Sequence, residues 1–156
     1  MSFCGWSIDI EAMKYILSLS EQNKTILELG SGRSTEILSK FFTVTSIEES
    51  SEWANKYDAE YIHAPIKNDW YDVDVLKEAN LSDRDFDIII IDGPAYGKRM
   101  KILENLDLFN LKDTLIIVDD IERKEDAELL KKIIEIKKQI NGNVKKSVIK
   151  NVAFVL

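Results

Sequence analysis

The segment ILELGSGRST, residues 26–35, joins an apolar run to a turn built from small residues. The apolar half predicts a buried strand, and the second half predicts a loop that leads into a helix. Gly30 and Gly32 lie in this loop, where a glycine-rich turn lets a ligand approach the backbone closely. The dinucleotide-binding pattern needs a third glycine at position 35, where this chain has Thr35. A pyrophosphate would therefore lose its closest approach to the helix.

Strand and helix patterns alternate along the rest of the chain. Apolar, β-branched segments predict strands at residues 25–29, 43–48, 60–64, 86–92 and 114–120, and a hairpin over residues 144–156 that turns at Lys150-Asn151. Helical spacing of apolar residues predicts helices at residues 9–20, 34–42, 51–57 and 124–140. This alternation is typical of a parallel sheet with right-handed crossovers. We therefore expect a single domain over residues 1–156 with an α/β, Rossmann-like fold: a doubly wound, mostly parallel seven-stranded sheet with a C-terminal antiparallel hairpin.

Composition limits the classes of function. The net charge of −7 argues against nucleic acid as a partner, because phosphate binding draws on clustered lysine and arginine. The longest aliphatic run, residues 88–91, is far too short to span a membrane. The first ten residues lack the basic region and apolar core of a signal peptide, so we expect a cytoplasmic protein. One cysteine, Cys4, and one histidine, His63, exclude a Cys/His zinc cluster.

Acidic residues follow several of the predicted strands. In a doubly wound sheet, ligands bind beyond the carboxyl ends of the strands, where the strand order reverses. The acidic residues expected at that edge are Glu28, Glu48, Glu49, Asp92, Asp119 and Asp120. We predict that this edge of the sheet is the functional site.

The residues at this edge resemble a known family. The segment Glu28-Leu29-Gly30-Ser31-Gly32 resembles the Glu-x-Gly-x-Gly signature of class I methyltransferases that use S-adenosylmethionine (SAM). The segments VTSIEES, FDIIIIDGP and LKDTLIIVDD are similar to the second, fourth and fifth strand segments of that family, and the resemblance covers about residues 10–156. It implies that SAM is bound by residues of the glycine motif and of the second strand end: Glu28, Gly30, Ser31, Gly32, Glu48 and Glu49.

Simple physical chemistry agrees with SAM as the cofactor. SAM carries no phosphate, so a third glycine is unnecessary and Thr35 is compatible with it. Glu48 lies 18 residues after Gly30 (48 − 30), close to the roughly 20 residues that separate a ribose-binding acid from the glycine loop in a related fold. The positively charged sulfonium is also favoured by an acidic strand edge.

The resemblance further implies a metal site. Asp92, Asp119 and Asp120 match the aspartates that hold a divalent cation in metal-dependent O-methyltransferases of the catechol and caffeoyl-CoA type and in similar antibiotic-pathway enzymes. Oxygen ligands suit Mg²⁺, Ca²⁺ or Mn²⁺. The chain departs from the catechol pattern, because Asp120 stands where an amide is usual and no lysine lies three residues past Asp92. Lys98 and Tyr96 lie near Asp92 in the sequence as substitutes for a base, although neither matches a position of the family. Asp92 and Lys98 are the expected catalytic residues.

Other interpretations of these residues stay open. Asp119 and Asp120 are alternatively caps of the helix at residues 123–140. Trp70 and Tyr71 either stack on the cofactor or substrate, or pack on the sheet edge. The segment GPAYGKR, residues 93–99, is no P-loop, because it has one residue too few between its glycines and Arg99 replaces the metal-binding Ser or Thr.

The predicted function is methyl transfer from SAM to a small-molecule acceptor, a hydroxyl compound. The alternatives are a SAM-binding protein without transferase activity, an aminopropyltransferase and an NAD-linked oxidoreductase. The short loops leave the strand edge open, so we also expect a homodimer in which a second subunit covers the site.

Overall fold

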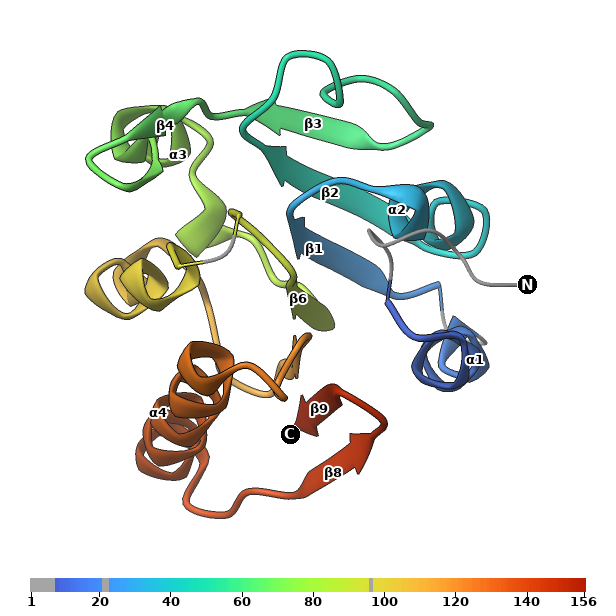
Figure 1. Ribbon diagram of the computed structural model, residues 1–156, viewed down its shortest axis with the longest axis vertical. Helices are drawn as coiled ribbons and strands as arrows, with labels where there is room; N and C mark the ends of the chain where they lie inside the picture. Colours follow the sequence, from blue (N-terminus) through green and yellow to red (C-terminus); the bar gives the residue numbers. More distant parts are fainter. Residues whose placement is uncertain (1–7, 21–22, 96) are drawn as a thin grey trace.

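Figure 1 shows the computed structural model, in which residues 8–20, 23–95 and 97–156 are described; Cys4 and Tyr96 lie outside these ranges. One sheet contains seven strands in the order β3-β2-β1-β6-β7-β9-β8. Its strands are β1 (Thr25–Leu29), β2 (Thr43–Glu48), β3 (Glu60–His63), β6 (Ile88–Ile91), β7 (Leu115–Val118), β8 (Lys146–Ile149) and β9 (Val152–Val155). The first five strands are mutually parallel, and β9 pairs antiparallel with both β7 and β8. The predicted sheet and C-terminal hairpin are confirmed.

The strand order reverses at β1. This strand pairs with β2 on one side and with β6 on the other, so the chain winds outward in both directions from the centre of the sheet. The loops that follow β1 and β6 therefore leave the sheet next to each other, at the place where doubly wound sheets bind ligands.

Helices cover both faces of the sheet (Figure 1). The helices are α1 (Ile10–Ser18), α2 (Arg33–Leu38), α3 (Val73–Glu78) and α4 (Lys124–Asn141). Side chains of α1 and α2 pack with Ile88 and Ile90 of β6, whereas side chains of α3 and α4 pack with Ile89 and Ile91. Each face of β6 is thus buried against helices, which explains why its sequence is four isoleucines without a polar alternation.

Short elements lie between the main strands. They are β4 (Ile66–Lys67), β5 (Trp70–Tyr71) and the 3₁₀ segments η2 (Leu81–Asp83), η3 (Arg99–Glu104) and η4 (Leu106–Leu108). Trp70 is buried and packs edge-to-face near Phe109, which fits the packing interpretation of this side chain. Among the described residues, the helices lack the combination of length and apolar character needed to cross a lipid bilayer.

Two predicted helices differ from the structure. Residues 51–57 form turns rather than a helix, because Asn55 has a φ of +63° that ends the helical turn begun at Ser50. Helix α2 is shorter than predicted and ends at Leu38. The two phenylalanines that follow it, Phe41 and Phe42, lie in the connection to β2.

A lysine replaces an isoleucine in the buried face of α4. The helical spacing of apolar residues over residues 124–140 predicts one wide apolar face that includes Ile140, but this side chain is 43% exposed. Lys137 is buried instead, and its Nζ donates hydrogen bonds to the carbonyl oxygens of Leu111 (2.9 Å) and Thr114 (2.8 Å). A periodic apolar pattern does not reveal a buried lysine, because the pattern contains no information about backbone acceptors on a neighbouring segment.

Candidate functional site at the carboxyl edge of the sheet

Glu28 lies beneath the glycine loop and is only 1% exposed. Its Oε2 accepts hydrogen bonds from the hydroxyls of Thr35 (2.6 Å) and Ser46 (3.1 Å). These bonds connect β1 with the first turn of α2 and with β2. Burial raises the pKa of Glu28 from 4.5 to about 7, although the two hydroxyl donors oppose the shift. The predicted contact of Glu28 with a cofactor stays a prediction.

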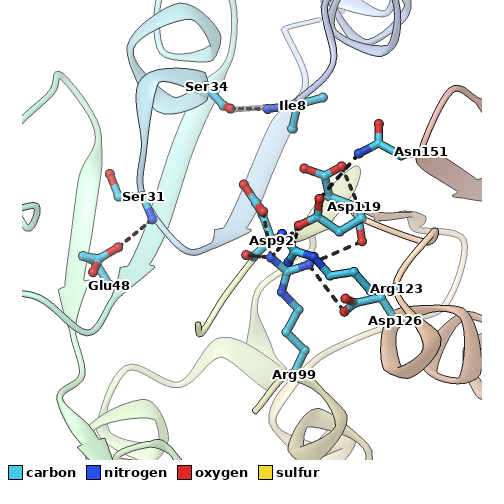
Figure 2. Close-up of polar contacts among 11 residues, drawn as sticks. Ile8, Ser31, Ser34, Glu48, Asp92, Arg99, Asp119, Arg123, Asp126 and Asn151 are labelled. Carbon is cyan, nitrogen blue, oxygen red and sulfur yellow. Dashed lines mark hydrogen bonds and ion pairs between the residues drawn. The ribbon is translucent and has the colours of Figure 1, made fainter. Parts of the chain in front are cut away.

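Glu48 bridges the loops that follow β1 and β2. Its Oε2 accepts a hydrogen bond from the backbone N–H of Ser31 (2.7 Å), as Figure 2 shows, and its Oε1 accepts one from the N–H of Ser50 (2.7 Å). The acid predicted to bind a ribose is therefore adjacent to the glycine loop. Next to it, Oε2 of Glu49 is buried without a hydrogen-bond partner. Burial raises the pKa of Glu49, and the nearby charge of Lys98 opposes that shift.

Two glycines bring the loops after β1 and β6 into contact. Gly30 has a φ of +94°, a conformation that glycine adopts without strain. A Cβ atom on Gly93 would lie 2.8 Å from the Cα of Gly30 and 2.5 Å from the hydroxyl of Tyr71. This hydroxyl is buried without a hydrogen-bond partner. The close approach explains why position 93 has no side chain, and it places Asp92 beside the glycine loop.

Three carboxylates converge where β6 and β7 end. Asp92, Asp119 and Asp120 each offer a ligand atom within 4.8 Å of the others. Burial, followed by repulsion from Asp119, raises the pKa of Asp92 well above its usual range. Burial and repulsion from Asp120 raise the pKa of Asp119 to about 6. The strand ends therefore bring together the three aspartates that the sequence indicated.

The sequence analysis missed Arg99 as a member of this group. Its guanidinium is buried and donates hydrogen bonds to Asp92 Oδ1 (3.0 Å) and Asp120 Oδ2 (3.2 Å), as well as to the backbone carbonyl of Asp92 (Figure 2). It also pairs with Asp126 on α4 at 3.4 Å. The available signal was an arginine seven residues after Asp92, but η3 has no apolar period that predicts its orientation.

Asp119 and Asp120 do not cap helix α4, so the capping interpretation is wrong. The N-cap of α4 is Arg123, without a side-chain capping bond. Asp119 accepts the backbone N–H of Asp120 instead (2.8 Å). Asp120 has a φ of +58°, and its carboxylate contacts Arg123 (2.7 Å) and Asn151 (3.5 Å) in addition to Arg99. The turn after β7 thus directs both aspartates into the cluster.

A divalent cation does not fit this arrangement while Arg99 stays in place. The oxygens converge as a metal site requires, but the arginine already neutralises two of the three carboxylates. Arg99 would have to leave before a metal could bind these oxygens. The cation expected from the sequence stays a prediction. The resulting edge combines a glycine loop, two glutamates, and an aspartate cluster with its own cation.

Solved structures with a similar arrangement include methyltransferases. MycE methyltransferase of the mycinamycin biosynthetic pathway, in complex with Mg, S-adenosylhomocysteine (SAH) and mycinamycin VI, matches with a TM-score of 0.64 and 17% identity over 99% of this chain. The match covers 50% of the MycE chain, so this chain spans about half the length of MycE. The chain has the class I methyltransferase fold.

Two further structures with this methyltransferase fold match most of both chains. A methyltransferase-like protein from Silicibacter pomeroyi has a TM-score of 0.56 and 17% identity, with 97% of this chain and 87% of that chain covered. Human methyltransferase-like protein 13, in complex with SAH, has a TM-score of 0.54 and 13% identity, with 94% and 81% covered. Searches with protein-family models and against curated proteins gave no match.

Proposed function

We propose that the protein binds SAM at the carboxyl edge of β1 and β2 and transfers its methyl group to a small molecule. The contact between Ser31 N–H and Glu48, at 2.7 Å, is the observation that carries this proposal. It brings an acid at the end of β2 to a glycine loop at the end of β1, in a sheet with the methyltransferase fold. The complexes of MycE and of human methyltransferase-like protein 13 with SAH support the choice of cofactor.

The residues of this edge fit such a cofactor. The N–H groups of Gly30, Ser31 and Gly32 already donate within the protein, so the loop contributes its close backbone approach rather than free donors. Each carboxylate oxygen of Glu48 accepts one backbone N–H and keeps a second lone pair that can accept a hydroxyl proton of a ribose. Glu49 has a buried oxygen without a partner, which suits an additional donor from a ligand. The excess of carboxylates along the edge favours a positively charged sulfonium.

We further propose that the acceptor is a hydroxyl compound. SAM, when bound, supplies an electrophilic methyl group on sulfur. The carboxylate of Asp92 is 23% exposed at the centre of the edge, and its raised pKa makes it a stronger base than a free aspartate. Asp92 then accepts the hydroxyl proton while the hydroxyl oxygen bonds to the methyl carbon and sulfur keeps the electron pair of the broken S–C bond. Lys98, whose charge acts on Glu49, is the second candidate catalytic residue. The complex of MycE with mycinamycin VI supports a small-molecule acceptor for this fold.

Calorimetric titration tests the cofactor assignment. We expect binding of SAM and SAH, and no binding of NAD, by wild-type protein. Replacing Glu48 with alanine is expected to weaken SAM binding by about 1.5–3 kcal/mol, or about 10–150-fold, because hydrogen bonds to a charged group are lost. Glu52, which is exposed on the following turn, provides the control variant Glu52→Ala. Unchanged affinity in a folded Glu48→Ala protein would rule out the ribose assignment.

An acceptor panel tests the reaction. We expect SAH and a product heavier by one methyl group with hydroxyl compounds, detected by mass spectrometry. Asp92→Asn is expected to lower the rate by about 10²–10⁴-fold, the range of general base catalysis, while SAM binding persists.

SAM binding without turnover on any acceptor would instead favour the non-catalytic binding protein. Turnover of decarboxylated SAM would favour the aminopropyltransferase. Loss of turnover in EDTA would support the divalent metal predicted from the sequence. Light scattering in the presence of SAM tests the predicted homodimer.

A further inference from the structure

The tip of the Arg99 side chain lies inside the aspartate cluster. The side chain is 6% exposed, and its Nη2 atom contacts both Asp92 Oδ1 (3.0 Å) and Asp120 Oδ2 (3.2 Å). Its Nη1 atom donates to Asp126 Oδ1 and to the carbonyl oxygen of Asp119, both at 3.4 Å. The Nε atom has no hydrogen-bond partner. The hydrogen bonds of the guanidinium are therefore made by its two terminal nitrogens, Nη1 and Nη2, which lie among the aspartates (Figure 2).

The position of this group coincides with the position that a bound cation would need. A divalent ion held by oxygens sits about 2.0–2.6 Å from its ligands. Two of the three converging carboxylates already accept hydrogen bonds from one nitrogen of Arg99. A metal between the same carboxylates would lie against the positively charged guanidinium, so the two cations exclude one another.

Further ion pairs hold Arg99 in this position. Asp126 on α4 pairs with Arg99, and this carboxylate is 3% exposed. Asp120 has a second guanidinium, that of Arg123, at 2.7 Å. Arg99 and Arg123 thus face four aspartates, of which Asp119 and Asp126 are buried together with Arg99. Removal of Arg99 would take away its ion pairs with Asp92 and Asp126.

We propose that Arg99 takes the place of a divalent cation among Asp92, Asp119 and Asp120, so that the native protein holds these carboxylates together without a metal. Replacing the guanidinium by a neutral side chain of similar length converts the cluster into a divalent-cation site. This inference does not rest on methyl transfer, because metal binding is measured without cofactor or acceptor.

The test is a Mn²⁺ titration followed by electron paramagnetic resonance, with wild-type protein and Arg99→Met. We expect no stoichiometric binding by the wild type and one Mn²⁺ per chain in Arg99→Met. In EDTA, we expect the melting temperature of Arg99→Met to be about 10 °C lower than that of the wild type, because the aspartates that pair with Arg99 lose that partner. Mn²⁺ is expected to restore much of this loss, because a ligand that binds only the folded state stabilises it.

Control variants locate the bound ion. Arg84→Met removes a guanidinium that pairs with Glu60 away from the cluster, so this variant should bind no Mn²⁺. Adding Asp119→Asn to Arg99→Met should abolish the binding. The inference is overturned if wild-type protein binds one Mn²⁺ that Asp119→Asn removes, or if folded Arg99→Met binds none. Should Arg99→Met not fold, the wild-type titration still decides, and Arg99→Lys, which keeps the charge, should fold and bind no Mn²⁺.

Discussion

The free energy of unfolding of the wild-type protein is expected to fall between acidic and mildly alkaline pH, and in Glu28→Gln this fall should be smaller by about 3 kcal/mol. The pKa of Glu28 is about 7 in the folded protein, against 4.5 for an exposed glutamate, because the carboxyl is buried. Between these values the folded state binds the proton more tightly than the unfolded state does. Glu28 therefore contributes stability that is present below about pH 4.5 and is lost as the pH rises to about 7. A difference of 2.5 pKa units (7 − 4.5) corresponds to about 3 kcal/mol.

Urea denaturation at pH 5 and pH 8 measures this effect. Wild-type protein should have the lower free energy of unfolding at pH 8, and Glu28→Gln should show a smaller difference between the two pH values. Glutamine keeps an oxygen that accepts hydrogen bonds from Thr35 and Ser46. Glu36→Gln, at an exposed position of α2, should behave like the wild type. Equal pH dependence in wild type and Glu28→Gln would show that the buried carboxyl is ionised throughout.

Adding one methyl group at Gly93 is expected to be the most disruptive small change in the site. The new Cβ would lie 2.5 Å from the hydroxyl of Tyr71 and 2.8 Å from the Cα of Gly30, so backbone or side chain must move. Overpacking of this kind costs about 3 kcal/mol at its usual upper limit. Because the displaced backbone is the glycine loop, we expect Gly93→Ala to lose measurable SAM binding as well.

A second variant separates the two clashes. In Gly93→Ala/Tyr71→Phe the hydroxyl contact is absent but the contact with Gly30 remains, so only part of the lost stability should return. Gly142→Ala is the matched control, because Gly142 has a φ of +77° but open space around it. That control should cost about 1 kcal/mol or a little more, from backbone strain alone. If Gly93→Ala costs no more than Gly142→Ala, the two loops do not approach as closely as described.

The sheet was predictable because its signals are strong and local. Ile88–Ile91 must be buried on both faces, and a chain of such strands alternating with helices has few topologies. The same topology aligns the carboxyl ends of parallel strands, so Glu48, Asp92 and Asp119 could be assigned to one edge from their positions at strand ends. No measurement of side-chain position was needed for that step.

Arg99 and Lys137 could not be predicted in the same way. Both are cations that lie buried against acceptors brought in by distant parts of the chain, such as Asp126 on α4 and the carbonyl of Thr114 before β7. A sequence motif compares residue types at fixed spacing, and in the P-loop comparison Arg99 counted only as a mismatch. The helix predicted at residues 51–57 was wrong for a different reason. Asn55 has a left-handed backbone conformation, which ends the helical turn despite a favourable helical pattern.

The buried amine of Lys137 has a consequence for the aspartate-bearing loop far from it. Its hydrogen bonds to the carbonyls of Leu111 and Thr114 join α4 to the segment that enters β7. Residues 119–123, which connect β7 to α4, therefore lie within a segment of chain whose two ends are joined by the hydrogen bonds of Lys137. Ordering a backbone residue costs about 1–2 kcal/mol of conformational entropy, and here that loss is complete once the domain has folded. A ligand that binds Asp119 and Asp120 should therefore lose less free energy to ordering this loop than a ligand of a loop without such a cross-link.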